Sequence, residues 1–495
     1  MLSPILIDLP PLAFLFAFVG AIIAGAIVAS GNILYAALFG GALIGLIIAG
    51  SPVLLLWVTI ITSLVLAGTA RLYLPGLQNI RWLVPVAVLG LTAHAFFSQL
   101  AIPKIQRGRP IPAILWWALA FFCITLLSTL GNMPSGAQML RGYKGYFQVW
   151  GLLIALAYIP WPAVLINKLP RALLGIALLQ VPFALHQYFV VVPSRVTQGI
   201  VPVDIVAGTF GAELEGGGLN ALLSAFQFMV VAGLIALWRR DRLSGTRALT
   251  LSAVLLVPLL INEAKVSLVY GIIVFLVLYR NEIVRPLRFL RQGLVFTVVF
   301  GIFLMAYTMN APSDKVQSWT DLIMFTYGYN VSTKENQEGE LTRWGELEFW
   351  AQKHGVKNLP HTLLGYGLGV SRVSDGGVME SLIPTDRSSA GKVGSINPAL
   401  GIGNTAVAAL LWETGIIGLL CIFALFWSAY RLAFHLERRY AQDPWQSAIF
   451  RAGQAAIAVF FVSLGHKNLL VFEVGFQTVL MLLFGYLVYW HRRHE

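Results

Sequence analysis

The chain has 495 residues, of which 58% are hydrophobic and only 11% are charged, and its mean hydropathy is +0.76. Soluble domains carry about a quarter charged residues, so this composition excludes an ordinary soluble protein and predicts an all-α polytopic membrane protein. The formal net charge of +12 does not indicate nucleic-acid binding, because the basic residues form short clusters between apolar segments, as in the positive-inside pattern of membrane proteins.

The N-terminus and the cysteines add little chemistry. The opening residues MLSPILIDLPPLAF lack a basic stretch and a small-residue cleavage site, so we expect a retained first span and not a removed signal peptide. Both cysteines, Cys123 and Cys421, lie in apolar segments, which argues against a disulfide. No metal-binding spacing such as CxxC or HExxH is present, so we expect neither a metal nor a cofactor.

Apolar runs of the length that a membrane helix needs, about 20 residues, recur along the chain. They predict fourteen transmembrane helices, near 11–29, 32–49, 52–69, 82–99, 112–130, 148–165, 171–190, 219–237, 247–262, 265–279, 289–308, 403–430, 448–465 and 469–490. Fourteen spans would place both termini on one side of the membrane. The connections near Gly50–Pro52 and Asn262–Lys265 are so tight that either pair is alternatively one broken helix.

The basic residues predict the orientation. Alternate loops carry Lys104, Arg107 and Arg109; Lys168 and Arg171; Arg239, Arg240, Arg242 and Arg247; Arg280, Arg285, Arg288 and Arg291; Arg431, Arg438 and Arg439; and Arg492 and Arg493. Short basic loops mark the cytoplasm, so both termini should be cytoplasmic, although Arg71 and Arg81 fall on the other side. The chain then divides into helices 1–11 (1–310), one long outer loop (311–401), and three further helices with a short cytoplasmic tail (402–495).

The long outer loop is the candidate active-site loop, since long loops in compact proteins are commonly functional. Within it, Leu341, Trp344, Leu347 and Trp350 recur every three residues, which predicts an amphipathic helix lying on the membrane and ending near Gly355. The same helix carries Arg343, which would bind an anion or, alternatively, pair with Glu346 on the exposed face.

Cations on the outer side run against the positive-inside bias and need a reason. They are Arg141, Lys144, Arg195, Lys265, Arg343, Arg372 and Lys467. A lipid-linked diphosphate would supply that reason, because Arg and Lys bind phosphate oxygens and stabilise a phosphate leaving group; snorkelling to lipid headgroups is the alternative. Lys265 lies between two apolar runs, where an ionisable group usually faces a cavity or a partner, and it is too close in sequence to Glu263 to share a helix face.

Histidines and carboxylates complete the set of candidate residues. His361 and His466 are the outer histidines best placed to act as a general base; a structural role is the alternative for each. Glu413 and Glu473 lie in or at the ends of membrane helices, so we expect each to have a partner among the outer cations or to hold one of them in place.

Two phrases, RW followed by HTLLGYGLGV and then GNTAVAALLWETGIIGLL, resemble the bacterial O-antigen polymerase and O-antigen ligase superfamily over about residues 340–420. The resemblance implies an undecaprenyl-diphosphate-linked glycan donor and a metal-independent transfer at the periplasmic face of the inner membrane. It places Arg343 at a family arginine that holds the diphosphate and Lys265 at the nearest counterpart of a second one. Trp344, Asn404 and Glu413 would support the site.

The chain departs from the family at the proposed base. Where the family has histidine in "HN", this chain has Gly403 followed by Asn404. Either His361 or His466 replaces that histidine, or the acceptor needs no base, or the catalytic assignment fails.

These observations predict a glycan polymerase of the bacterial inner membrane. Arg343, Lys265, Arg141, Lys144 and Arg372 would hold the diphosphate, and the partners would be the lipid-linked glycan, membrane lipids and other polysaccharide assembly proteins. Three alternatives stay open: a ligase, a lipid-linked oligosaccharide flippase or transporter, and a non-catalytic assembly subunit.

Overall fold

The computed structural model describes most of residues 48–101, 111–194, 202–212, 218–283, 342–371 and 402–493, with isolated positions at 45 and between 285 and 331. The chain divides into two compact units, residues 1–58 and 59–495. The second unit contains every residue of the site described below.

Regular structure in the described residues is helical, apart from one isolated bridge between Ala212 and Gly218. The α-helices are α3 (Pro52–Ile61), α4 (Ala67–Tyr73), α5 (Leu83–Ala101), α6 (Ala113–Asn132), α7 (Gly136–Phe147), α8 (Trp150–Tyr158), α9 (Ala163–His186), α10 (Asn220–Arg239), α11 (Gly245–Ile261), α12 (Val266–Tyr279), α15 (Arg343–Lys353), α16 (Leu359–Leu364), α18 (Ala406–Arg439), α19 (Pro444–Ser463), α20 (Leu469–Phe472) and α21 (Val474–Arg493). Short π or 3₁₀ segments are η1 (Thr62–Leu66), η2 (Pro75–Trp82), η4 (Gln187–Val191), η5 (Val192–Ser194), η6 (Pro202–Ile205), η7 (Gly208–Phe210) and η8 (Val356–Asn358).

Seven helical stretches in the described residues are long and apolar enough to cross a membrane. They are Pro52–Tyr73, Asn79–Leu100, Ala113–Asn132, Ala163–Ser194, Asn220–Arg239, Ala406–Arg439 and Val474–Arg493. The all-α, multi-pass prediction is therefore confirmed, and the count of fourteen spans stays a prediction. The expected spans 11–29 and 32–49 and most of 289–308 lie outside the described residues.

One predicted boundary is wrong. The sequence predicted spans at 148–165 and 171–190, with a basic loop between them, but α8 ends at Tyr158 and α9 continues from Ala163 through the expected loop. Proline explains the shift, because Pro160 and Pro162 bring no amide hydrogen to the connection and Pro162 occupies the N-cap of α9. The basic residues of the expected loop thus lie inside a helix.

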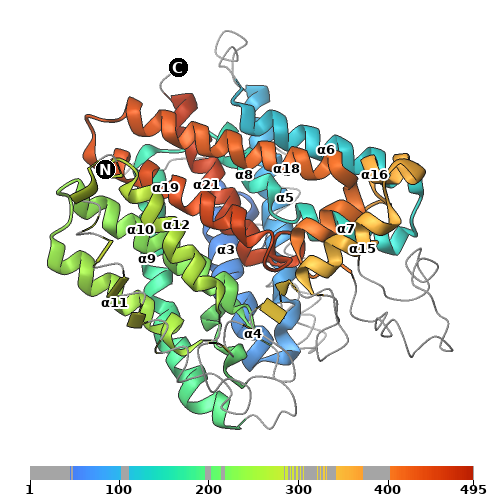
Figure 1. Cartoon of the computed structure of the whole chain (residues 1–495). Coiled ribbons are helices and arrows are strands. Elements are labelled where there is room, and N and C mark those ends of the chain that lie inside the picture. Colours follow the sequence, from blue (N-terminus) through green and yellow to red (C-terminus); the bar gives the residue numbers. More distant parts are fainter. Residues whose placement is uncertain are drawn as a thin grey trace, which may run out of the picture. The chain divides into compact units, whose positions relative to one another are not determined.

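Small residues let the central helices approach one another closely. α10 packs on α19, and α19 also packs on α12 and α18, as Figure 1 shows. Both helices carry several buried alanines, namely Ala221, Ala225, Ala232 and Ala236 on α10 and Ala448, Ala452, Ala455 and Ala456 on α19. Van der Waals packing through small residues is how membrane helices associate when lipid removes the hydrophobic drive between them.

The glycine-rich turn after α16 packs against a kink in α18. Gly415 interrupts α18 with φ +65°, and a Cβ on Gly365 would lie 2.5 Å from the carbonyl carbon of Glu413. Backbone hydrogen bonds fasten the contact, since the amide of Tyr366 donates to Trp412 O at 2.8 Å and that of Gly367 donates to Glu413 O at 3.1 Å. The two phrases HTLLGYGLGV and WETGIIG are therefore one packed unit.

Replacing Gly365 by Ala should destabilise the protein severely. Gly365 has φ +70° and ψ −165°, where an L-residue is strained by about 1–3 kcal/mol, and the new methyl would also overlap the backbone of α18. Gly355 has similar angles, φ +115° and ψ −155°, but a Cβ there meets nothing within 4 Å. We expect Gly365→Ala to lower the thermal midpoint in detergent well below that of Gly355→Ala. Equal losses would contradict the close contact.

Candidate functional site

Arg343 is the first residue of α15, and it is fixed from two sides. Thr342 caps the helix by accepting a hydrogen bond from Gly345 N at 3.0 Å. The Arg343 Nε donates to the carbonyl oxygen of His466 at 2.5 Å, and Nη1 donates to the Oδ1 of Asn330. A guanidinium with this many fixed contacts is held in one orientation at the end of the helix.

Glu346 joins α15 to the start of α18. Its buried carboxylate accepts hydrogen bonds from Asn404 N at 2.9 Å, from Thr405 N at 3.2 Å and from Thr405 Oγ1 at 3.2 Å. The first amides of a helix have no partner within the helix and attract negative charge. The alternative of an exposed pair between Arg343 and Glu346 is therefore wrong, because Glu346 faces α18.

The turn between α19 and α20 is fastened to the same residues. Asn468 N donates to Asn404 O at 2.7 Å, Asn468 Nδ2 donates to Gly403 O at 2.9 Å, and Val407 N donates to Leu464 O at 3.2 Å. These bonds hold the intervening His466 beside the beginning of α18.

Gly403 itself has no room for a side chain. A Cβ there would lie 2.9 Å from the Cβ of Ser371 and 3.2 Å from that of Ala409. A histidine at this position would require the neighbouring turn to move.

His466 lies among three cations. Burial, followed by the charges of Arg343, Lys467 and Lys265, holds the pKa of His466 well below its usual range. Its imidazole is therefore neutral near pH 7, and its ring nitrogens form no hydrogen bond with any described residue. A neutral imidazole with an open nitrogen is able to accept a proton.

The two lysines of this group come from separate elements. Lys265 occupies the N-cap position of α12. Lys467 donates from Nζ to the carbonyl oxygen of Gly218 at 3.2 Å, which ties the turn to the loop before α10. Lys467 follows His466 directly in the chain, and this adjacency is the sequence signal for its place in the group.

His361 lies in a different environment, on α16. Its Nδ1 lies 2.6 Å from Asn358 Oδ1, and its Nε2 lies 3.0 Å from Asn132 Oδ1. Its ring stacks on that of Tyr366, with 4.2 Å between the ring centres. The Asn132 amide donates to two carbonyl oxygens, those of Ser128 and Gly365, so its oxygen faces the imidazole. With both ring nitrogens occupied, His361 has the contacts of a residue that holds structure together.

His354, at the end of α15, lies in the same environment as His361, because the rings of both histidines contact Tyr366. His354 caps α15 and stacks on Trp350 at 4.7 Å, and its ring also contacts Tyr366 and Trp412. Arg343 lies at the opposite end of α15, about 16 Å away for the rise of an α-helix. The structure thus joins Arg343 to the turn of His466 by a hydrogen bond, and the charge of Lys265 acts on the same imidazole. His361 lies instead with an aromatic cluster.

Glu413 has a different partner from the one expected. Its Oε1 accepts from Ser371 N at 3.0 Å and from Ser371 Oγ at 2.5 Å. The expectation of a cation partner is therefore wrong for Glu413, although Glu473 does pair with Arg71 at 3.9 Å. Glu413 fixes the end of the glycine turn, which is a supporting position.

The remaining predicted residues have other positions. Arg141 and Lys144 lie on α7, a short capped helix, and not in an open loop. Lys144 Nζ lies 3.2 Å from the centre of the Trp82 ring, and burial together with Arg81 lowers the pKa of Lys144. Trp344 is exposed, and Arg372 lies outside the described residues.

No family model matches the chain, and no curated protein matches it either. Any functional assignment therefore rests on the geometry of the group formed by Arg343, Lys265, Lys467 and His466.

The buried carboxylate of Glu346 predicts that the stability of the protein depends on pH. Burial raises the pKa of Glu346 from 4.5 to about 7, against the opposing effects of its hydrogen bonds and of Arg343. The folded state therefore binds this proton more tightly than the unfolded state, so its stabilising contribution is complete below pH 4.5 and is lost as pH rises through about 7.

Thermal unfolding in detergent from pH 5 to pH 8 measures this contribution. We expect the Glu346→Gln variant to lack the decline of the midpoint across that interval. Glu348→Gln is the matched control, because Glu348 accepts a hydrogen bond only from Gln352 among the bonds resolved on its own helix. An unchanged decline in Glu346→Gln would refute the assignment of the titrating group.

Proposed function

We propose that this protein is a membrane-embedded glycosyltransferase that uses a polyprenyl-diphosphate-linked glycan as donor. The observation that carries the proposal is the convergence of Arg343, Lys265 and Lys467 on the neutral imidazole of His466. Cations suit a diphosphate leaving group, and a neutral histidine suits the proton of an attacking hydroxyl. The combination of the two features supports transfer of a glycan from a diphosphate to a hydroxyl.

In the proposed reaction an acceptor sugar hydroxyl attacks the anomeric carbon of the donor. The new carbon–oxygen bond forms as the bond to the diphosphate breaks, and the electron pair leaves with the diphosphate. Arg343 and Lys265 stabilise the charge that develops there. His466 accepts the hydroxyl proton. No metal is required for this balance.

The position of His466 also accounts for the departure at Gly403. Asn468 bonds to both Gly403 and Asn404, so the turn that carries His466 lies where the resembled family has its histidine. In this proposal the base has moved from the start of α18 to the adjacent turn. The resemblance to O-antigen polymerases and ligases remains part of this proposal.

The arrangement of the helix ends supports a periplasmic site. The cluster includes the starts of α12 and α18 and the residues that follow α19. The loops assigned to the cytoplasm by their basic residues follow the ends of α10, α12 and α18. We therefore place the cluster at the periplasmic face of a bacterial inner membrane, within a topology of fourteen spans.

The first test replaces Arg343. Arg343→Ala should lower glycan product by about 10²–10³-fold, the usual effect of losing one transition-state donor, in cells that contain normal amounts of the protein. Arg343→Lys should retain part of the activity, because it keeps the charge but loses the bidentate geometry. Lys353→Ala, at the far end of the same helix, is the control and should leave the product unchanged. Normal activity in Arg343→Ala would remove the basis of the proposal.

The second test separates the two histidines. His466→Ala should reduce turnover by about 10²–10⁴-fold, as expected for a general base, and His466→Gln should not restore it. His361→Ala should instead lower the thermal midpoint, and His361→Gln should recover stability by donating to Asn132. Turnover and midpoint measured on the same purified samples distinguish these outcomes. The opposite pattern would transfer the base assignment to His361.

A deletion strain distinguishes polymerase, our preferred assignment, from ligase. Loss of a polymerase leaves single repeat units on the lipid carrier, whereas loss of a ligase leaves long unattached chains. Analysis of the carrier-linked glycans by mass spectrometry gives this answer. Complete absence of carrier-linked glycan at the outer leaflet would instead indicate a flippase.

A further inference from the structure

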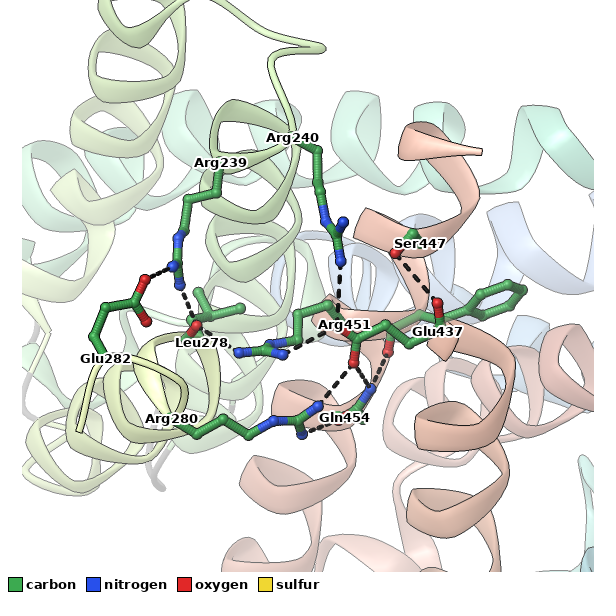
Figure 2. Close-up of polar contacts among 10 residues, drawn as sticks. Arg239, Arg240, Leu278, Arg280, Glu282, Glu437, Ser447, Arg451 and Gln454 are labelled. Atoms are coloured by element: carbon green, nitrogen blue, oxygen red, sulfur yellow. Dashed lines mark hydrogen bonds and ion pairs between the residues drawn. The ribbon is translucent and has the colours of Figure 1, made fainter. Parts of the chain in front are cut away.

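A second charged cluster lies at the opposite ends of the helices that form the proposed active site. It consists of Arg240, Arg280, Arg438 and Arg451 around Glu437, and we call it the arginine cluster. Arg240 and Arg280 directly follow α10 and α12, Arg438 lies in the last turn of α18, and Arg451 lies in the first half of α19. Figure 2 shows Arg240, Arg280 and Arg451 converging on Glu437.

Glu437 has both carboxylate oxygens occupied. Oε1 accepts from Arg451 Nη1 at 3.0 Å and lies 3.5 Å from Arg240 Nη2. Oε2 accepts from Arg280 Nη2 at 2.9 Å and from Gln454 Nε2 at 2.8 Å. One negative charge therefore interacts with three guanidinium groups.

The arginine cluster surrounds a cavity of about 450 Å³. Four arginines and one glutamate line it, together with Asn281, which leaves a formal surplus of three positive charges. Arg451 is only 8% exposed, and its Nε has no hydrogen-bond partner in the described structure. The lining therefore carries more positive than negative charge, while burying a donor such as Arg451 Nε without a partner is itself costly.

Capping of helix ends explains only part of the arrangement. Arg451 Nη2 donates to Leu278 O at 2.9 Å near the end of α12, and Arg239 donates to the same carbonyl oxygen. Cations are stabilised at helix C-termini, so these two arginines have a structural role. Arg240 and Arg438 make no such bond among the resolved contacts; both are exposed at the cavity, and Arg438 lies over the Phe434 ring.

We propose that the arginine cluster binds a phosphate-bearing anion. Guanidinium groups bind phosphate oxygens in a bidentate manner, and basic pockets between transmembrane helices are suited to anionic headgroups. An anion would satisfy the surplus charge and supply acceptors to the lining. This site is distinct from the proposed active site and does not depend on the glycosyltransferase assignment.

The decisive variant removes two rim arginines and leaves the buried bonds to Glu437 from Arg280 and Arg451 in place. Arg240→Gln combined with Arg438→Gln lowers the charge of the cavity by two. The matched control is Arg247→Gln combined with Arg431→Gln, since both residues are exposed and neither lines the cavity. Equal thermal midpoints in the absence of phosphate would show that both double variants are folded.

The experiment uses the full-length protein and two sources of phosphate. Every sample carries Arg343→Ala and Lys265→Ala, so that diphosphate bound at the proposed active site does not contribute, and "wild type" here denotes this background without a further change. In zwitterionic detergent, inorganic diphosphate is titrated by isothermal calorimetry. In nanodiscs of phosphatidylcholine, with or without phosphatidylglycerol, the same titration is repeated. We expect the rim variant to bind diphosphate at least about tenfold more weakly than the wild type, a change of roughly 1.4 kcal/mol, and the control to bind as the wild type does.

The two lipid compositions identify the natural source. Weaker diphosphate binding in phosphatidylglycerol nanodiscs, seen in the wild type and not in the rim variant, would assign the site to a lipid headgroup. Equal binding of diphosphate by the wild type in both kinds of nanodisc would assign the site to a soluble phosphate compound. Absence of diphosphate binding by the wild type in every medium, or equal binding by the rim variant and the wild type, would overturn the proposal.

Discussion

The hydrogen bonds between Glu346 and the first amides of α18 are the interaction on which the candidate site depends. They hold α15 against α18, and so they place Arg343 within reach of the turn that carries His466. A buried carboxylate is costly unless hydrogen bonds satisfy it, and the unpartnered amides of a helix terminus supply those bonds. One carboxylate thereby orients two segments that are far apart in sequence.

The surroundings of this contact are fixed by close backbone approach. The glycine turn packs on the kink of α18 where Gly365 meets Glu413, and Ser371 completes the turn by bonding to the Glu413 carboxylate. These contacts leave Gly403 without room for a side chain. In the proposed mechanism the base is His466 on the neighbouring turn, because this packing leaves no space for a side chain at Gly403.

The sequence predicted the features that follow from composition and periodicity. Apolar runs predicted the all-α membrane class and most helix positions in the described part of the chain. The spacing of apolar residues predicted the helix that begins at Arg343. The sequence also singled out Arg343, Lys265 and His466, because charged residues at a membrane face need a partner. What it could not predict were contacts set by tertiary packing. Glu346 looked like an exposed partner of Arg343, and its burial depends on α18.

The dependence on tertiary packing also explains the other differences between the sequence predictions and the structure. His361 and His466 were equivalent as outer histidines, and only the amides of Asn132 and Asn358 around His361 distinguish them. The expected loop at Lys168 was wrong, since the prolines at 160 and 162 end α8 earlier than hydropathy indicated. The arginine cluster was visible only as separate basic loops, and the packing of α10, α12, α18 and α19 gathers those residues around one glutamate.

The most direct test of the central claim is the binding of undecaprenyl diphosphate to the purified protein in nanodiscs, followed by phosphorus NMR. All proteins in this comparison carry Arg240→Gln and Arg438→Gln, so that the arginine cluster does not contribute. We expect the protein with Arg343 and Lys265 intact to perturb the two phosphorus resonances and a variant combining Arg343→Ala with Lys265→Ala not to do so. His466→Ala should still perturb them, because His466 acts on the acceptor and not on the diphosphate. Equal perturbation by the proteins with and without Arg343 and Lys265 would contradict the account.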